Sequence, residues 1–422
     1  MYFNLLKGCF NLFDKLRDNS RIIVYIVVAV FVISGGFMGF GAYMSGNNNS
    51  SKQRRSPNEA IAEVNGEEIS YQEYLNAMRN NAQRASQLSS TQLVNFRLNI
   101  LNSIIERRII LNQAQEMGIN VQVTEKDIDN SIQDILNNNN MTKEELEKNL
   151  KEQDYSIADL RNDLRLNLQT QKKIQKTVKK SYEDIKISEE EIKKEYEKQA
   201  ENNKNIASYE EKKSEIEKNL LNKKQNNEFK KWMQDLKESA NIKIYDNSLK
   251  GIKALNNKNY ETAIASFKKS LDNSETPTNY ILLAKSYGEA EKSDKALETY
   301  KTAVEKYPEN WEVRYNYGQL MSSIDKTKEA EKQLDKASEY ASDSDFMAHY
   351  QIYQSFNNIG AEEKAQKEMD KIIEIQQNRN QNSQTQNNES NQNKSQETFG
   401  EEEASENSLD EEDLEVDTVP SD

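Results

Sequence analysis

The sequence has very few of the residues that most catalytic and metal sites need. Its 422 residues include one cysteine, Cys9, and one histidine, His349. A single cysteine excludes an intramolecular disulfide framework. The motifs GxxxxGK followed by Ser or Thr, CxxC, HExxH and GxSxG, which serve phosphate binding, metal binding and nucleophilic catalysis, are also missing. We therefore expect no metal or other cofactor, and we expect His349 on the surface of a helix.

Proline and glycine are also scarce, with four and 13 residues. Both residues disfavour helix interiors, so their scarcity favours long helices. Hydrophobic residues make up 35% of the chain and charged residues 30%. That balance fits helical, well-solvated domains better than one large core, and the length allows two or three domains. The sequence thus predicts a mainly α-helical protein.

Positive charge is missing from the C-terminal end. Residues 395–422 contain 12 Asp and Glu and no Lys or Arg, while the whole chain has a formal charge of −14. The rest is therefore close to neutral and has no electrostatic footprint for nucleic acid. Residues 377–422 contain too few apolar side chains to fold, so we predict a disordered tail. It could keep the protein soluble, repel anionic lipid or compete for a basic client surface.

One stretch has no charge at all. Ile22–Met44 has 23 residues, and as a helix it would span ~35 Å, more than the ~30 Å core of a bilayer. A cleaved signal peptide would have a shorter apolar region, so we predict a retained transmembrane helix over 22–44. Four Lys and Arg precede it and three follow it closely, a bias that favours a cytoplasmic N-terminus over 1–21. Residues 45–57 would be a polar linker, with the rest of the chain outside the inner or plasma membrane.

Residues 58–246 carry signals for a first folded module with several capped helices. Asn65-Gly66 between two short apolar stretches predicts a β-hairpin. Ser70 with Glu73 predicts a helix start with a capping box. The same pairing of a hydroxyl with an acid three residues later occurs at Thr124, Thr142, Ser156 and Ser188.

Two further features complete this module. Apolar residues between 96 and 111 cover most of a helix circumference, which is typical of a central, buried helix. Gly118 then supplies a stop signal. We also expect Ile242 and Ile244 to pair with the Ile61–Val64 segment, because an isolated short strand leaves backbone groups unsatisfied.

Taken in order, these blocks resemble a known family. The segments "AEVNGEEISYQEY", "LNSIIERRIILNQAQEMGINVQVTEKDID" and "ISEEEIKKEYEKQ" follow one another behind a single predicted anchor. This arrangement resembles the SurA/PpiD/PrsA family of extracytoplasmic chaperones and prolyl isomerases over about residues 55–246. The resemblance implies a helical chaperone domain with a small β element. The anchor resembles that of the PpiD branch, which implies a periplasmic position near the Sec translocon.

The segment that separates two charged helices is short. In the family a parvulin prolyl-isomerase domain follows the block that ends here near Gln199, yet the next helix begins near Ser208, about eight residues later. A parvulin domain needs ~100 residues to bury its core. Parvulin sites also resemble clusters of His, Cys or Asp, and the one histidine of this chain is far away. We therefore predict that the protein is not an enzyme and keeps the chaperone half of the family's function.

Residues 247–376 repeat themselves with a period close to 34 residues. A small residue recurs at Ala263, Ala296, Ala330 and Ala365, at spacings of 33, 34 and 35. This period is typical of tetratricopeptide (TPR) repeats. The pattern predicts an α-solenoid of about four repeats, the last of them a poorly matching capping repeat. A generic helical bundle is the alternative, but a bundle does not require such a period.

Two sets of residues are candidates for binding. The first module has more apolar residues than a small core needs, and some of them could face unfolded clients. That set is Tyr71, Tyr74, Met78, Phe229, Trp232 and Met233. The alternative that all six are core stays open, with the two interpretations balanced for Trp232. By repeat register, the concave face of the TPR stack would present Lys285, Tyr315, Gln319, Tyr350 and Gln354.

The sequence as a whole indicates a membrane-anchored, ATP-independent holdase for newly translocated proteins. The SurA-like module would hold unfolded clients, and the TPR stack would recruit a partner or a second part of the client. The PpiD branch works with a separate membrane-anchored TPR protein, and this chain is similar to both parts fused. The rival interpretation is a TPR scaffold in envelope assembly, with the SurA-like module as a dimerisation or spacer element.

Overall fold

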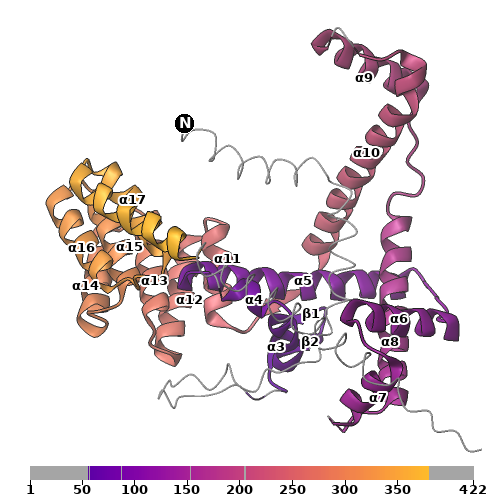
Figure 1. Cartoon of the computed structure of the whole chain (residues 1–422), viewed down its shortest axis with the longest axis horizontal. Coiled ribbons are helices and arrows are strands. Elements are labelled where there is room, and N and C mark those ends of the chain that lie inside the picture. Colours follow the sequence, from indigo (N-terminus) through magenta and orange to yellow (C-terminus); the bar gives the residue numbers. More distant parts are fainter. Residues whose placement is uncertain (1–55, 57, 87, 153, 204–205, 380–422) are drawn as a thin grey trace, which may run out of the picture. The chain divides into compact units, whose positions relative to one another are not determined.

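The computed structural model describes residues 56–379 except 57, 87, 153, 204 and 205. The chain divides into two compact units, one that ends at Ser274 and one that begins at Glu275 (Figure 1). The predicted anchor over 22–44, the predicted cytoplasmic segment 1–21 and almost all of the predicted linker and tail lie outside these residues. Within the described range, none of the helices is both long enough and apolar enough to cross a membrane.

The first unit begins with a small antiparallel sheet. Its strands, in the order β2-β1-β3, are β1 (Ala60–Val64), β2 (Glu67–Ser70) and β3 (Ile242–Ile244). Val64 lies opposite Ile242, and Ala62 lies opposite Ile244. The predicted pairing of these segments is therefore confirmed, and the chain leaves the module beside the strand by which it enters.

The turn of the hairpin follows from its two residues. Asn65 and Gly66 have φ angles of 52° and 87°, the left-handed values that a two-residue type I′ turn needs. Ser70 then caps the next helix, because its hydroxyl accepts the N–H of Glu73 at 3.1 Å. The second half of the predicted capping box is wrong. Ser70 is paired with Ala60 in the sheet, and the carboxylate of Glu73 instead binds Arg108 at 3.1 Å.

Helices make up the rest of the first unit (Figure 1). They are α3 (Tyr71–Arg79), α4 (Ala82–Ala85), α5 (Ser90–Glu116), α6 (Glu125–Asn139), α7 (Lys143–Lys151), α8 (Ile157–Lys180), α9 (Glu189–Asn202), α10 (Tyr209–Ser239), α11 (Asn247–Asn256) and α12 (Tyr260–Asn273). The predicted capping boxes are present at Thr124, Thr142, Ser156 and Ser188. Each satisfies two backbone N–H groups that a helix start leaves free.

Helix α5 is the centre of the first unit. Its buried residues, from Val94 to Ala114, cover most of its circumference, and β1, α3, α8, α10 and α11 contact it. The prediction of a central, buried helix is therefore confirmed. The helix stops at Gly118, whose φ of 62° lies in the left-handed region that glycine adopts without strain. The N–H of Ile119 then donates back to the carbonyl of Ala114 at 2.8 Å.

The first helix pair of the repeat region belongs to the first unit. Helix α11 packs against α5, and Asn256 donates to Asn95 of α5 at 3.0 Å. Helices α11 and α12 meet closely, because a Cβ added at Gly251 would lie 2.8 Å from the ring of Phe267. The repeat pattern begins at residue 247, whereas the compact unit ends at Ser274. This helix pair therefore serves the core of the SurA-like module as well as the repeat pattern.

The second unit consists of paired antiparallel helices. These are α13 (Pro277–Glu289), α14 (Ser293–Lys306), α15 (Trp311–Ser323), α16 (Thr327–Tyr340) and α17 (Phe346–Asn358), followed by a last helix over residues 362–379. The small residues of the repeat pattern lie where helices meet: Ala296 and Ala330 are 0% exposed. The last helix continues to Arg379, three residues into the segment for which the sequence predicts a disordered tail.

Candidate binding surfaces

The predicted client-facing residues of α3 are divided between core and surface. Tyr74 is 1% exposed, and its hydroxyl accepts a hydrogen bond from Arg97 Nε at 3.1 Å. Burial raises the pKa of the Tyr74 phenol, although the Arg97 charge opposes the shift. Tyr71 stacks on Tyr74 with ring centroids 6.1 Å apart. Tyr71 and Met78 are half-buried, so these two offer surface to a ligand and Tyr74 does not.

The predicted residues of α10 lie where this helix meets α5 and α8. Met233 is 6% exposed and packs with Ile110 of α5 and Val178 of α8. Phe229 and Trp232 are half-buried against these three residues, with ring centroids 5.9 Å apart. We call these five residues the α10 cluster. Met233 is part of its core, and Phe229 and Trp232 are the aromatic side chains through which it reaches the surface.

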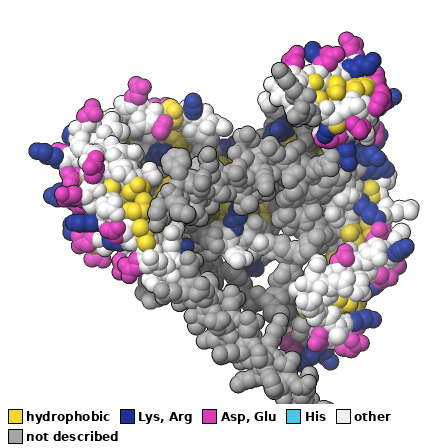
Figure 2. Space-filling view, turned by 45° about the horizontal axis from the view of Figure 1, so that its top comes forward, with side chains coloured by type: hydrophobic (Ala, Val, Ile, Leu, Met, Phe, Trp, Pro, Cys, Tyr) yellow, Lys and Arg dark blue, Asp and Glu magenta, His cyan; other side chains and the backbone are white. Residues whose placement is uncertain are grey.

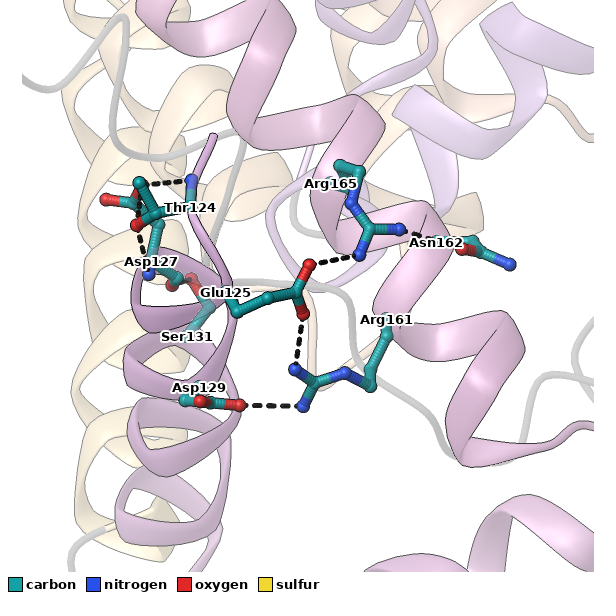
Figure 3. A network of polar contacts seen from close by, with 8 residues as sticks. All are labelled: Thr124, Glu125, Asp127, Asp129, Ser131, Arg161, Asn162 and Arg165. Carbon is teal, nitrogen blue, oxygen red and sulfur yellow. Dashed lines mark hydrogen bonds and ion pairs between the residues drawn. The ribbon is translucent and has the colours of Figure 1, made fainter. Parts of the chain in front are cut away.

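A network of charges joins α6 to α8 (Figure 3). Arg161 donates to Glu125 and to Asp129, each at 2.7 Å, and Arg165 donates to the second oxygen of Glu125 at 2.7 Å. The hydrogen bonds from Arg161 and Arg165 hold the pKa of Glu125 below its ordinary value. Each of these carboxylates is paired with an arginine. The network is therefore a clamp between two helices and not a ligand site.

The clamp continues along α8. Asp127 accepts hydrogen bonds from Lys172 Nζ and from the N–H of Thr124, each at 2.7 Å, which hold its pKa well below the usual range. The N-terminal half of α8 shares a buried cluster with α6 and α7, made of Ile128, Ile132, Leu146, Leu150 and Leu160. Its C-terminal half carries Val178 of the α10 cluster. Helix α8 therefore connects the α10 cluster to the buried cluster that it shares with α6 and α7.

Several contacts join α9 to the start of α10. Tyr196 donates to the carbonyl of Ala207 at 3.1 Å and packs edge-on against Tyr209, with ring centroids 5.4 Å apart. Glu189 accepts from Tyr209 at 2.7 Å. Between the same two helices, the hydrogen bond from Lys224 of α10 lowers the pKa of Glu191 of α9 to about 2. These contacts hold the first and middle turns of α9 against α10.

The residues predicted for the concave face of the repeats lie on α13, α15 and α17. Lys285, Tyr350 and Gln354 are exposed, whereas Tyr315 and Gln319 are half-buried. The amide of Gln319 donates to the hydroxyl of Ser355, so it links α15 to α17. Tyr315 packs against the buried cluster beneath these helices.

Aromatic side chains pack in two groups, one on α15 and one on α17. Ring centroids are 6.2 Å apart for Trp311 and Tyr315, 6.2 Å for Phe346 and Tyr350, and 6.4 Å for Tyr350 and Tyr353. We call these five residues the aromatic face. Tyr350 is 38% exposed, and Figure 2 shows hydrophobic side chains gathered on the repeat helices among charged ones.

The sequence-based set missed three members of this face, Trp311, Phe346 and Tyr353. A signal for two of them was present. Residues 346, 350 and 353 are aromatic at the spacing of one helix face, in a 13-residue helix without Lys, Arg, Asp or Glu.

His349 does not lie on a helix surface, and that prediction is wrong. Its side chain is 0% exposed, with Nδ1 2.7 Å from Glu368 Oε2 and Nε2 3.2 Å from the carbonyl oxygen of Ser342. Ser338 and Lys371 also donate to Glu368. We call these five residues the buried network. In the described part of the chain, no group of three or more His, Cys, Asp or Glu could hold a metal ion.

Two family models match parts of the chain. The family model of the SurA-like N-terminal domain matches residues 12–174. The model of subunit 3 of the anaphase-promoting complex, cyclosome, matches residues 256–337, within the repeat region. Among curated proteins, no match is found.

Several solved structures show some likeness to the chain. MamA from AMB-1 is 20% identical, with 32% of this chain and 74% of that chain covered and a TM-score of 0.25. YrrB, described as a TPR protein with an unusual peptide-binding site, is 21% identical, with coverages of 43% and 92% and a TM-score of 0.25. Yeast Tom70 is 14% identical, with coverages of 72% and 83% and a TM-score of 0.22.

The repeat assignment rests on this chain itself and on the matched family model. Ala296 and Ala330, 34 residues apart, occupy equivalent buried positions in successive helix pairs. A Cβ added at Gly318 would lie 3.1 Å from Leu334, so the paired helices need a small residue there. The chain joins a SurA-like N-terminal domain to a TPR-like stack.

Proposed function

We propose that this protein is a membrane-anchored chaperone that holds unfolded proteins without nucleotide, on the outer side of the inner or plasma membrane. The observation that carries the proposal is the SurA-like N-terminal domain. The α10 cluster supplies a surface for this role, because Phe229 and Trp232 are half-buried rings on a supported helix. Such rings give a client a large apolar contact at a low cost in conformational entropy.

The holding activity has a direct test in the full chain. We expect it to suppress light scattering when a chemically denatured client is diluted into buffer without ATP. Trp232→Ser should weaken the suppression severalfold, since it removes one of the two rings that reach the surface. Leu166→Ser is the matched control, because Leu166 is 62% exposed on α8. Equal effects of both variants, or unchanged suppression by Trp232→Ser with circular dichroism intact, would contradict the assignment of this surface.

We further propose that the protein does not catalyse prolyl isomerisation. Helix α9 ends at Asn202 and α10 begins at Tyr209, so six residues stand between them, against the ~100 residues that a parvulin domain needs. The expected result is no acceleration of a proline-limited refolding reaction by the full chain. Acceleration that survives removal of contaminating isomerases would contradict this part of the proposal.

The anchor over 22–44 and a position near the Sec translocon are proposed from the sequence. Crosslinking in intact membranes, from one exposed position in each unit, would identify neighbours by mass spectrometry. Translocating chains or translocon subunits are the expected partners. Crosslinks to cytoplasmic proteins alone would contradict the orientation.

A second candidate function is a TPR scaffold in envelope assembly. The observation in its favour is the aromatic face, which is more extensive than the surface of the α10 cluster. The aggregation assay separates the two functions. A full chain that binds a stable partner through the repeats but never suppresses aggregation would support the scaffold.

A further inference from the structure

We propose that the aromatic face of the second unit binds extended peptides that carry arginine. The inference rests on the proposed partner-binding role of the repeats and names the chemical class of the partner.

The chain already places one guanidinium on this surface. The Arg379 guanidinium carbon lies over the ring of Phe346, 5.8 Å from its centroid, and Nη2 donates to the carbonyl oxygen of Ser344 at 3.4 Å. A planar cation that stacks on an aromatic ring and donates to a nearby carbonyl is a favourable arrangement for arginine. Arg379 therefore shows how the end of the aromatic face accepts this side chain.

The next ring of the aromatic face, Tyr350, is partly open to solvent. The ring of Tyr350 is nearly parallel to that of Phe346, at an interplanar angle of 4°. Tyr350 is 38% exposed and Met347 46%, and Gln354 is exposed one turn further along. A peptide could thus stack a cationic side chain on Tyr350 and use the amide of Gln354 for its backbone.

The charge around the face selects a positive partner. Helix α17 itself has no Lys, Arg, Asp or Glu, and a cation from the last helix, Arg379, already lies over its Phe346 ring. Carboxylates lie at the ends of α15 and α17 where the aromatic face begins: Glu312 is in the first turn of α15, and Asp343 and Asp345 directly precede α17. From residue 275 to residue 379 the chain has 20 Asp and Glu against 14 Lys and Arg, a formal charge of −6. An acidic peptide, including the tail of this chain, would be repelled.

The test measures peptide binding to the full chain in detergent by fluorescence anisotropy. The probes are synthetic peptides with arginine spaced by serine, and matched peptides with lysine, citrulline or glutamate at the same positions. We expect the arginine peptide to bind most tightly and the lysine peptide more weakly. The citrulline and glutamate peptides should not bind, because citrulline keeps the shape of arginine without its charge. High salt should weaken the binding.

Variants assign the binding to this face. Tyr350→Ala should raise the Kd of the arginine peptide about two- to fivefold, as for the loss of one exposed cation–π contact. Tyr350→Phe keeps the ring and should keep the affinity. Tyr245→Ala is the matched control, since Tyr245 is 42% exposed in the first unit. Equal binding of the glutamate peptide, no binding of any peptide, or an unchanged Kd with Tyr350→Ala would overturn the proposal.

Failure of this inference and failure of the proposed function give different results. Loss of arginine binding with intact suppression of aggregation would overturn only this inference. Arginine binding without any suppression would support this inference and contradict the holdase.

Discussion

Two networks of polar side chains hold helices together in this molecule, one at the surface of the first unit and one centred on a buried pair in the second. In the clamp between α6 and α8, the side chains of Arg161 and Glu125 are 31% and 62% exposed and 2.7 Å apart. In the buried network, His349 and Glu368 are also 2.7 Å apart but only 0% and 3% exposed. Distance therefore does not distinguish the two networks, whereas access of water does.

The contribution of each network to stability depends on how far water reaches it. Exposed pairs exchange hydration for a partner and contribute ~0–1 kcal/mol to stability. Removal of one partner from a buried pair leaves an uncompensated charge and costs ~3–5 kcal/mol. The buried network also spans more of its unit, because it joins Ser338 of α16, His349 of α17 and Glu368 of the last helix. We expect the second unit to depend on a few buried polar groups and the first unit on its apolar clusters.

The largest effect should come from the buried network. His349→Ala would leave the Glu368 carboxylate with Ser338 and Lys371 but without the buried ring on its second oxygen. We therefore expect the free energy of unfolding of the second unit to fall by ~1–3 kcal/mol. The chain has two tryptophans, Trp232 in the first unit and Trp311 in the second. Urea unfolding followed by Trp311 fluorescence in a Trp232→Phe background would measure the loss. A change below ~1 kcal/mol would remove the difference between the two networks.

Acid should weaken the same network. Burial alone raises the pKa of Glu368, but the hydrogen bonds from His349 and Ser338 and the charge of Lys371 outweigh it, so the pKa lies below the ordinary 4.5. A carboxyl group with a lowered folded pKa adds stability that is complete above its unfolded pKa and is lost as the pH falls through the folded value.

The second unit should therefore lose stability as the pH falls below about 4.5, the ordinary value of the carboxyl group. Glu368→Gln should be less stable at neutral pH and should lose less on acidification. The measurement is urea unfolding followed by Trp311 fluorescence from neutral to acidic pH. Equal acid sensitivity of wild type and Glu368→Gln would show that other carboxylates govern the transition.

The fold was predictable where local chemistry decides it. Asn65-Gly66 needs a left-handed backbone, and the hydroxyl–acid pairs at Thr124, Thr142 and Ser156 each satisfy a helix start within three residues. Contacts between distant residues were not predictable in the same way. The period of the repeats locates α11 and α12, but it does not say that α11 packs against α5. That contact depends on which surfaces remain open after the first module has folded.

The candidate sites show the same limit more strongly. Apolar residue type does not separate Met233, in the core, from Trp232 beside it, because both belong to one cluster. His349 was predicted on a helix surface, yet it is buried beside Glu368, which follows 19 residues later. Gln319 was predicted to face a ligand, yet its amide is used between α15 and α17. In each case a neighbour supplied by the tertiary fold decides the role of the side chain.

The smallest effect should come from the exposed clamp, and it completes the comparison. Glu125→Gln removes the charge that Arg161 and Arg165 share, while the amide oxygen can still accept one hydrogen bond. We expect the stability of the first unit to change very little, because water reaches all three side chains. The loss should shrink further in high salt, where exposed charges are screened. Urea unfolding followed by Trp232 fluorescence in a Trp311→Phe background, at low and high salt, measures both effects. A loss of several kcal/mol that salt does not change would mean that the clamp behaves like a buried pair, and that exposure does not explain how the two networks differ.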